Sequence, residues 1–345
     1  MNIEKIRQYL QQAIERQIFP GCVLGGIVDG KEFVIAAGHY TYDKDAQPMR
    51  EDSIFDCASV TKAIPVSSLA LRLIDHKKLK LSDRLIDFLP VYNGSFKNEI
   101  CLGHLLTHTL DFDFRLSECK ELSPEELFRT ILNVKMKSPP GEKFCYANAT
   151  SILLGMLIER VSGKPLHKFA QDTFFNPLGM KNTTFFPEKI NVVCVPTETD
   201  PWRGRTIQGE VHDESAWILR KIMTPGSAGL FSTAPDLIRF IKMLLDGGKP
   251  FFRTATLEAM YTNQIPQING ERTGLGWELN QEYMGKNRTE TTFGKTGFTG
   301  CAVIVDRSRN AGLTLLSNYT WPKRKTNRDL INEVRAAVAD LVFNK

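Results

Sequence analysis

The 345-residue sequence lacks a long apolar run, and no stretch of it reads as an export signal. Its longest uncharged segment, Phe144 to Ile158, contains Asn, Thr and Ser and is shorter than the roughly 20 apolar residues of a spanning helix. Near the N-terminus, Glu4, Lys5 and Arg7 interrupt the apolar pattern that a secretory signal needs. We therefore expect a cytoplasmic protein without a membrane span.

The sequence also lacks paired cysteine motifs. Its seven cysteines are scattered and include no Cys-x-x-Cys. An odd number at such spacings argues against a disulfide framework and against a zinc site, and it suits a reducing compartment.

No sign of charge dominates, because 44 basic and 39 acidic residues leave a net charge of +5. The densest basic run is Lys323-Arg324-Lys325. It has no interleaved aromatic residues, and no zinc-finger or recognition-helix pattern accompanies it. We interpret it as the solvated start of the C-terminal helix and expect no nucleic-acid partner.

Hydrophobic residues make up 42% and charged residues 24% of the chain, as in ordinary globular proteins. The length suggests two domains or one enzyme-sized unit. Strand hairpins are predicted at both ends of the chain, around the turns at Asp29-Gly30 and at residues 309–312, and each end adds a helix. Two such ends suggest a single antiparallel sheet. The apolar face of the last helix is expected to comprise Leu330, Val334, Val338 and Leu341.

The middle of the chain is predicted to be mostly helical. One helix is expected from Ser59 toward His76, and residues 123–126 form a capping box. Residues 233–236 open another helix, which ends at Asp246-Gly247-Gly248. We therefore expect an α/β part made of residues 1–58 and 249–345, a helical part over 59–248, and a site in the cleft between them.

The first candidate for chemistry is Ser59-Val60-Thr61-Lys62. A serine at a helix start with a lysine three residues later places a hydroxyl and an amine on one face. An alcohol beside a group that can take its proton is the arrangement that nucleophilic catalysis needs. Alone the motif is weak, because Ser117-Glu118-Cys119-Lys120 matches it as well.

The second candidate is Tyr146-Ala147-Asn148. Two nearby ammonium groups would ease the loss of the phenol proton, so that Tyr146 could act as a base. Tyr261-Thr262-Asn263 repeats the pattern, but Tyr261 reads better as a residue on a helix face.

The third candidate, Lys295-Thr296-Gly297, occurs once, where a strand should run. The lysine and threonine offer a cation and a hydroxyl suited to a substrate carboxylate. Glycine there would let a substrate backbone approach the strand edge.

Together, in this order, the three motifs resemble the serine β-lactamase and penicillin-binding-protein superfamily. The class A middle element Ser-Asp-Asn is absent, and Tyr146-x-Asn148 replaces it, as in the class C branch of β-lactamases, D-alanyl-D-alanine carboxypeptidases and esterases. The resemblance covers roughly residues 15–320, and further matching segments are Leu105–Thr109, Pro140–Glu142, Val211–Glu214, Gly229–Thr233 and Gly274–Trp277.

The resemblance implies a β-lactamase/transpeptidase-like α+β fold, with an antiparallel sheet, flanking terminal helices and a mostly helical subdomain. It also implies residue roles. Ser59 would be the acylated nucleophile, Lys62 its proton partner and Tyr146 the general base. Asn148, Lys295, Thr296 and Gly297 would bind substrate, Asn148 at its amide and Lys295 and Thr296 at its carboxylate. The oxyanion hole would use the backbone N–H groups of Ser59 and Phe298. No metal or cofactor is required.

Two departures from the family pattern affect these expectations. After Thr109, where the family usually continues with Ser-Gly, the chain reads Leu110-Asp111-Phe112-Asp113, so substrate choice could differ. Pro65 removes a helical hydrogen bond near the nucleophile and is expected to kink the helix.

His104 and His108 are four residues apart, but no third ligand is evident, so we expect no metal site.

We therefore predict a serine hydrolase that forms an acyl-enzyme on Ser59 and acts on a small ester or amide, such as a β-lactam, a D-Ala peptide or a carboxylic ester. The alternative is a catalytically silent binding or assembly protein that keeps the fold. The natural substrate and the oligomeric state stay open.

Overall fold

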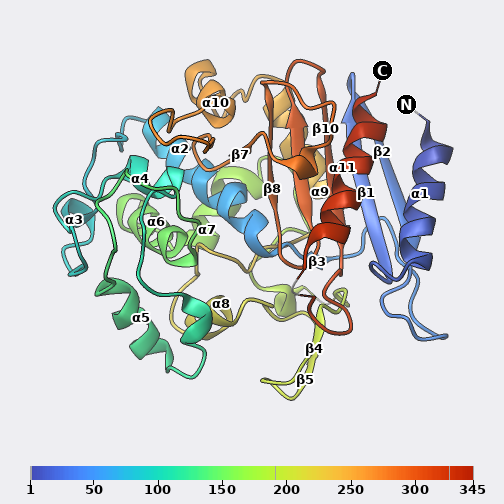
Figure 1. Cartoon of the computed structure of the whole chain (residues 1–345), viewed down its shortest axis with the longest axis horizontal. Helices are drawn as coiled ribbons and strands as arrows, with labels where there is room; N and C mark the ends of the chain where they lie inside the picture. Colours follow the sequence, from blue (N-terminus) through green and yellow to red (C-terminus); the bar gives the residue numbers. More distant parts are fainter. Residues whose placement is uncertain (1, 191, 326, 345) are drawn as a thin grey trace.

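A computed structural model describes residues 2–190, 192–325 and 327–344 of the chain (Figure 1). Its two ends together form one six-stranded antiparallel sheet, as the sequence predicted. The tight turn at Asp29 and Gly30 has positive φ at both residues, 49° and 78°, which suits a two-residue hairpin. The strand order is β2 (Lys31–Gly38), β1 (Gly21–Val28), β10 (Ala311–Ser317), β9 (Ala302–Asp306), β8 (Thr292–Thr296) and β7 (Glu278–Leu279).

Helices cover both faces of this sheet. The terminal helices α1 (Ile3–Glu15) and α11 (Asp329–Phe343) lie side by side on one face (Figure 1) and share a hydrophobic core with alternate strand residues such as Leu24 and Leu313. Helix α9 (Ala234–Leu245) lies on the other face, where Gly25 of β1 leaves room for Ile238. The flanked antiparallel sheet that the family resemblance implied is therefore confirmed.

The predicted apolar face of α11 was wrong at one position. Leu330 is 41% exposed, whereas Ile331 is buried with Val334 and Val338. The basic run also differs from its interpretation, because α11 begins only at Asp329. Arg324 instead forms ion pairs with Glu198 and Glu214.

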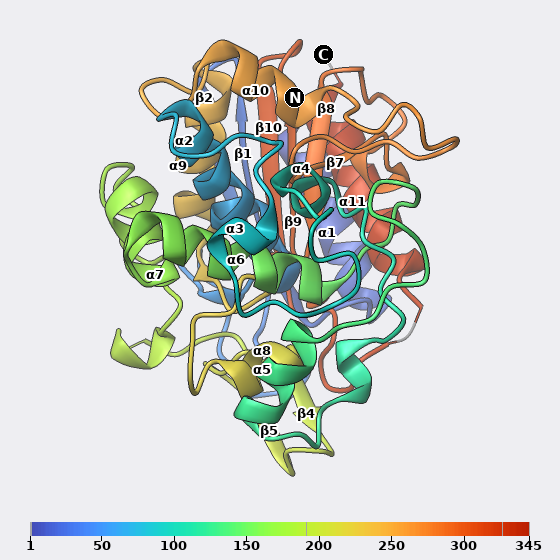
Figure 2. The same ribbon diagram turned by 90° about the vertical axis from the view of Figure 1, so that its left-hand side faces the viewer.

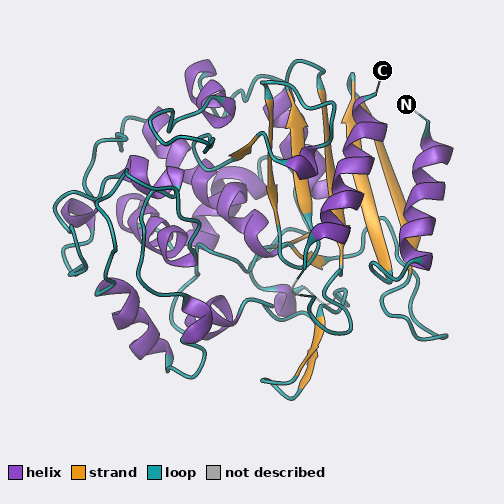
Figure 3. Cartoon of the chain, viewed as in Figure 1, coloured by secondary structure: helices purple, strands orange, loops and turns teal. Residues whose placement is uncertain are grey.

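The remaining helices gather beside the sheet, away from the two termini (Figures 1 and 3). At their centre is α6 (Asn148–Ser162), whose residues 149–158 are all buried. The capping box forms as predicted, since Glu126 N donates to Ser123 Oγ and Ser123 N to Glu126 Oε2. The other α-helices are α2 (Ser68–Asp75), α3 (Leu85–Phe88), α4 (Leu102–Thr107), α5 (Pro124–Leu132), α7 (Leu166–Ala170), α8 (Glu214–Leu219) and α10 (Thr254–Tyr261).

Two small antiparallel pairs form separate two-stranded sheets outside the main one. The pair β3 (Phe55–Asp56) and β6 (Phe231–Ser232) lies just before the predicted nucleophile. The pair β4 (Glu198–Asp200) and β5 (Arg205–Ile207) forms a hairpin that projects from the body in both views (Figures 1 and 2). The division of the chain after residues 58 and 248 stays a prediction.

The helix expected from Ser59 to His76 is not continuous. A 3₁₀ turn (Ala58–Lys62) is followed by a π-helical turn (Ala63–Ser67) and then by α2. The break is at Ile64, whose φ of −115° and ψ of 107° are extended. Because a proline disfavours the helical conformation of the preceding residue, Pro65 explains this break. Along the described ranges, no helix has both the length and the apolar character to span a bilayer.

We predict that Gly276→Ala destabilises the fold near the site. Gly276 has a φ of +81°, and an added Cβ would lie 2.1 Å from Cβ of Ser67, so strain and overlap should together cost about 2 kcal/mol or more. Chemical denaturation measures this loss.

Gly270→Ala is the matched control, because Gly270 has a φ of +80° and open space around its missing Cβ. It should lose only the backbone cost of about 1 kcal/mol. Equal losses in the two variants would contradict the steric argument.

Candidate active site

The hydroxyl of Ser59 and the amine of Lys62 meet, as the Ser-x-x-Lys motif predicts. The 3₁₀ turn that carries both residues brings Lys62 Nζ to 2.9 Å from Ser59 Oγ. The amine also donates to the carbonyl oxygen of Ser227 at 2.6 Å. Lys62 is 1% exposed, whereas Ser59 is partly exposed. The serine can therefore meet a substrate while the amine stays out of bulk water.

The turn before Ser59 is held in an unusual backbone conformation. Ala58 has a φ of +45°, which is sparsely populated for a residue with a Cβ and is retained only where neighbours enforce it. Its N–H donates to Asp56 Oδ1 at 2.8 Å, and its carbonyl accepts from Thr61 Oγ1 at 2.6 Å. These hydrogen bonds fix the course of the backbone between the end of β3 and Ser59.

Tyr146 lies between the two lysines of the predicted site. Its ring centroid is 5.1 Å from Lys62 Nζ and 4.5 Å from Lys295 Nζ. Burial of the hydroxyl raises its pKa, but the two ammonium charges and a hydrogen bond with Ser59 outweigh this effect and lower the pKa of Tyr146 below its ordinary value. The phenol is thus set up to lose its proton.

His108 packs behind Tyr146, with 4.9 Å between the ring centroids. It ends α4 in the left-handed conformation, and its carbonyl accepts from Cys145 N at 2.7 Å, which holds the loop before Tyr146. Burial, together with Lys295 and Lys62, lowers the pKa of His108 well below its usual range, so the ring is neutral.

His104 takes part in the N-terminal cap of α4, because its Nδ1 accepts from the backbone N–H of Cys101 at 3.2 Å. Within residues 2–190, 192–325 and 327–344, no three His, Cys, Asp or Glu side chains gather as a metal site would require.

Lys295 reaches the same place from β8 and is 2% exposed. Its Nζ forms an ion pair of 2.8 Å with Glu278 Oε1 of β7. Burial lowers the pKa of Lys295, but the negative charges of Glu278 and of an ionised Tyr146, with the hydrogen bond to Glu278, together outweigh burial and the net shift is upward. Sequence reasoning missed Glu278, although it directly follows the Gly-Leu-Gly-Trp segment that carried part of the resemblance.

Gly297 permits close packing inside the protein. A Cβ at this position would lie 2.4 Å from the carbonyl oxygen of Cys57. From the far side of the sheet, the buried Arg335 of α11 donates to the carbonyl oxygens of Gly297 and Cys301, at 2.8 and 2.9 Å. The strand end that follows Lys295 and Thr296 is therefore fixed on both sides.

Asn148 is oriented by Asp213, which the sequence analysis noted only as part of the family segment Val211–Glu214. Its Nδ2 donates to Asp213 Oδ2 at 2.9 Å, while Asp213 Oδ1 caps α8 by accepting from Ala216 N. The backbone N–H of the neighbouring His212 donates to Asp56 Oδ2 at 2.7 Å. The imidazole ring of His212 stacks on the ring of Phe298, with 5.6 Å between centroids. Two adjacent residues thus contact Asn148, Phe298 and the turn before Ser59.

A buried carboxylate supports this segment. Glu198 Oε2 accepts from His212 Nε2 at 2.8 Å and forms an ion pair with Arg324. Burial raises the pKa of Glu198, but these partners outweigh it and lower the pKa to about 2.

The second matches to the motifs lie elsewhere. Ser117 belongs to a separate 3₁₀ turn (Leu116–Glu118), and Tyr261, on α10, packs against Phe293 with 5.8 Å between ring centroids. Leu110, in the loop of residues 110–113 where the sequence departs from the family pattern, is fully buried in the main core.

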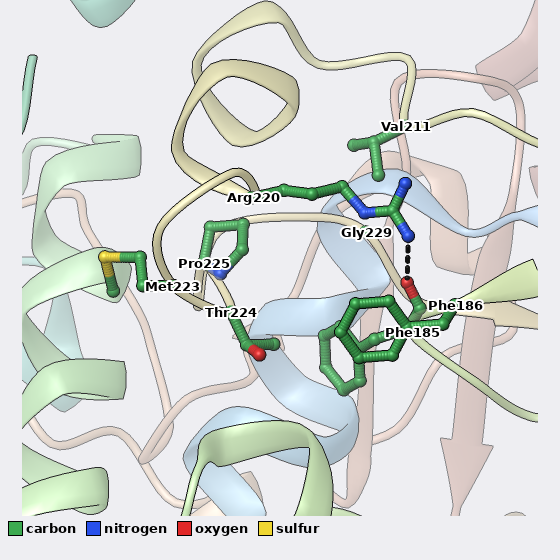
Figure 4. A pocket seen from close by; sticks show the side chains of 8 residues that line it. All are labelled: Phe185, Phe186, Val211, Arg220, Met223, Thr224, Pro225 and Gly229. Atoms are coloured by element: carbon green, nitrogen blue, oxygen red, sulfur yellow. Dashed lines mark hydrogen bonds between the residues drawn. The ribbon is translucent and has the colours of Figure 1, made fainter. Parts of the chain in front are cut away.

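A narrow, mostly apolar cavity also lies apart from Ser59 (Figure 4). Arg220 crosses it and donates to the carbonyl oxygen of Phe185 at 3.1 Å. Its lining includes none of the predicted site residues.

Comparison with known proteins gives the context of this geometry. Residues 6–336 match the Beta-lactamase family, which is nearly the whole chain. The chain belongs to the beta-lactamase family. The assignment to the serine β-lactamase superfamily made from the motifs is thereby confirmed.

Related proteins carry several hydrolase names. The chain is 28% identical to an N-acetylmuramyl-L-alanine amidase of Bacillus subtilis over 91% of this chain and 81% of that protein. It is 26% identical to a putative D-alanyl-D-alanine carboxypeptidase of Escherichia coli, covering 79% of this chain and 71% of the other.

Solved structures with the same fold include two with 21% identity. EstCE1, described as a hydrolase with promiscuous acyltransferase activity, has a TM-score of 0.77 and covers 98% of each chain. The octameric penicillin-binding protein homologue from Pyrococcus abyssi has a TM-score of 0.80 and covers 100% of this chain and 78% of its own. Fold, family and relatives together support a serine hydrolase.

We predict that the buried Glu198 contributes to acid stability. Because its pKa is depressed in the folded state, its contribution is complete above the ordinary value of 4.5 and is lost as the pH falls toward 2. The unfolding free energy should fall by about 2 kcal/mol over this range on account of Glu198 alone. Urea denaturation between pH 5 and pH 3 should give a shallower slope for Glu198→Gln than for the wild type.

Glu290→Gln is the control for this measurement, since Glu290 is 82% exposed in its pair with Arg272. Its slope should match the wild type. A Glu198→Gln slope as steep as that of the wild type would show that other carboxylates dominate.

Proposed function

We propose that the protein is a serine hydrolase that forms a covalent acyl-enzyme on Ser59 and hydrolyses a small ester or amide. The contact that carries this proposal is the 2.9 Å hydrogen bond between Lys62 Nζ and Ser59 Oγ, beside a tyrosine with a lowered pKa. Membership of the beta-lactamase family supports it. The names of the amidase and carboxypeptidase relatives support hydrolysis of an acyl bond.

In the first half of the reaction, the Tyr146 phenolate takes the proton of the Ser59 hydroxyl as Oγ bonds to the substrate carbonyl carbon. Lys62 and Lys295 stabilise the phenolate by charge, and Lys62 also hydrogen-bonds the serine oxygen. Breakage of the bond to the leaving group then consumes the proton held by Tyr146, which leaves an ester on Ser59.

In the second half, water replaces the leaving group. Tyr146 takes a proton from the water, the hydroxyl attacks the acyl carbon, and the bond to Ser59 Oγ breaks as the serine regains a proton. In both halves the backbone N–H groups of Ser59 and Phe298 would stabilise the oxyanion. The scheme uses only groups of the protein and water.

The substrate would lie between β8 and the helical region. Asn148, held by Asp213, would bind its amide or ester group, while Thr296 and Gly297 would align it along the strand edge. Thr296 is partly exposed and so can reach a substrate. β-Lactams, D-Ala peptides and carboxylic esters all present a carbonyl carbon that a serine hydroxyl can attack.

We predict that Tyr146→Phe and Lys62→Ala each slow acylation by at least about 100-fold, the scale of a lost general base. In the wild type, kcat/KM should rise with pH through the lowered pKa of Tyr146. Loss of the Lys62 charge removes one cause of that lowering, so the acidic limb of any residual Lys62→Ala activity should move to higher pH. Stopped-flow acylation across a pH series measures both effects, and an unchanged rate in either variant would refute its assigned role.

Intact-mass spectrometry tests the acyl-enzyme directly. The protein is mixed in parallel with a cephalosporin, a D-Ala-D-Ala peptide and a p-nitrophenyl ester, and a fluorophosphonate serves as a general serine probe. We expect a mass increase that disappears in Ser59→Ala. No adduct from any reagent, together with no ester turnover, would instead support the catalytically silent binding protein.

A further inference from the structure

Two buried cysteines meet next to the proposed nucleophile. Cys57 lies two residues before Ser59, and Cys301 directly precedes strand β9. Both side chains are fully buried, and a hydrogen bond joins the two thiol groups. No spacing pattern in the sequence pairs these residues, because they come from opposite ends of the chain and only the fold brings them together.

Backbone contacts hold the two cysteines against each other. Cys301 Sγ lies 3.5 Å from the carbonyl oxygen of Asp56, the residue before Cys57. Thr299 Oγ1 donates to the same carbonyl oxygen at 2.7 Å and to Cys301 Sγ at 3.6 Å. A Cβ added to Gly297 would lie 3.2 Å from the carbonyl carbon of Cys57 and 3.3 Å from Cβ of Cys301. The two backbone segments are therefore in direct contact, which is the first requirement for a disulfide.

The two sulfur atoms differ in their surroundings. Burial raises the pKa of Cys301, but hydrogen bonds with Cys57, Thr299 and the backbone of Ser317 outweigh burial and lower this pKa below its ordinary value. The hydrogen bond with Cys301, together with burial, raises the pKa of Cys57 well above its ordinary value. Because the thiolate is the reactive form of cysteine, Cys301 is the thiol that an oxidant meets first.

We propose that Cys57 and Cys301 form a redox-sensitive dithiol, which hydrogen peroxide converts to a disulfide and which thereby slows acylation of Ser59. The Cys301 sulfur attacks one oxygen of the peroxide and becomes a sulfenic acid, while the other oxygen leaves as water. The Cys57 sulfur then attacks the sulfenic sulfur, and a second water leaves as the S–S bond forms. The two sulfur atoms together lose two electrons, which reduce the peroxide to water.

The new bond would act on both sides of the proposed site, so this inference rests on the proposed hydrolase function. Cys57 begins the turn that leads to Ser59. The carbonyl of Cys301 accepts from the N–H of Gly297 at 2.7 Å, and this hydrogen bond closes the turn that carries Phe298. Two thiols in contact must move closer to become bonded, whereas a catalytic arrangement tolerates displacements of only about 0.5 Å. The disulfide should therefore shift the nucleophile relative to the proposed oxyanion hole.

The test treats the reduced protein with increasing amounts of hydrogen peroxide and maps its peptides without reduction. We expect a cross-linked pair of peptides that contain Cys57 and Cys301 and have lost two hydrogen atoms. As this pair forms, the rate of fluorophosphonate labelling of Ser59 should fall by at least about tenfold, because small displacements of reacting groups are costly. Dithiothreitol should restore the rate, since thiol–disulfide exchange reopens the bond.

Three alanine variants provide the controls. Cys301→Ala cannot form the bond and should keep its labelling rate in peroxide. Cys22 is equally buried, in the core shared by the sheet and the terminal helices, so Cys22→Ala should be slowed and restored like the wild type. Cys57→Ala should stop at the sulfenic acid of Cys301, which dimedone traps. Thermal melting of the variants shows whether they are folded.

Peptide mapping separates failure of this inference from failure of the proposed function. If Ser59 of the reduced protein is labelled but no peptide links Cys57 to Cys301, the inference is overturned and the hydrolase proposal stands. A cross-link without a change in labelling rate, or equal slowing of Cys301→Ala and the wild type, overturns it as well. If no reagent acylates Ser59, the hydrolase proposal falls and the effect on acylation falls with it, while the peptide map still decides whether the disulfide forms.

Discussion

The arrangement of the site depends on two lysines that are held out of water around one phenol. Lys62 and Lys295 are 1% and 2% exposed, yet Tyr146 between them is 43% exposed. Burial of an ammonium group is costly unless polar partners replace its hydration. The Ser227 carbonyl does this for Lys62 and Glu278 for Lys295. Their charges lower the pKa of Tyr146 although part of its side chain stays open to solvent.

The need to hold these groups explains much of the surrounding structure. One residue pair, His212 and Asp213, touches the turn before Ser59, the ring of Phe298 and the amide of Asn148. These groups come from parts of the chain that are far apart in sequence. A rigid polar segment between them fixes their relative positions better than separate contacts would, because each of its side chains is itself hydrogen-bonded.

Local patterns in the sequence were sufficient for the sheet, for the capped helices and for the contact between Ser59 and Lys62, because hairpin turns, caps and i,i+3 spacing act over a few residues. They were not sufficient for Glu278 or Arg335. Both act across strands or through the sheet, and a lone Glu or Arg in a sequence carries no sign of its distant partner. Leu330 failed for a smaller reason: neighbouring helix residues point about 100° apart, and at the start of α11 it is Ile331 that faces the core.

The guanidinium group of Arg335 links the proposed site to the far side of the sheet. It belongs to a helix on the opposite side of the sheet, and it contacts the carbonyl oxygens that border the end of β8. A small shift of that helix would tilt the strand edge without altering any residue that a ligand can reach. The geometry of the proposed site thus depends partly on a helix that no ligand in that site would touch.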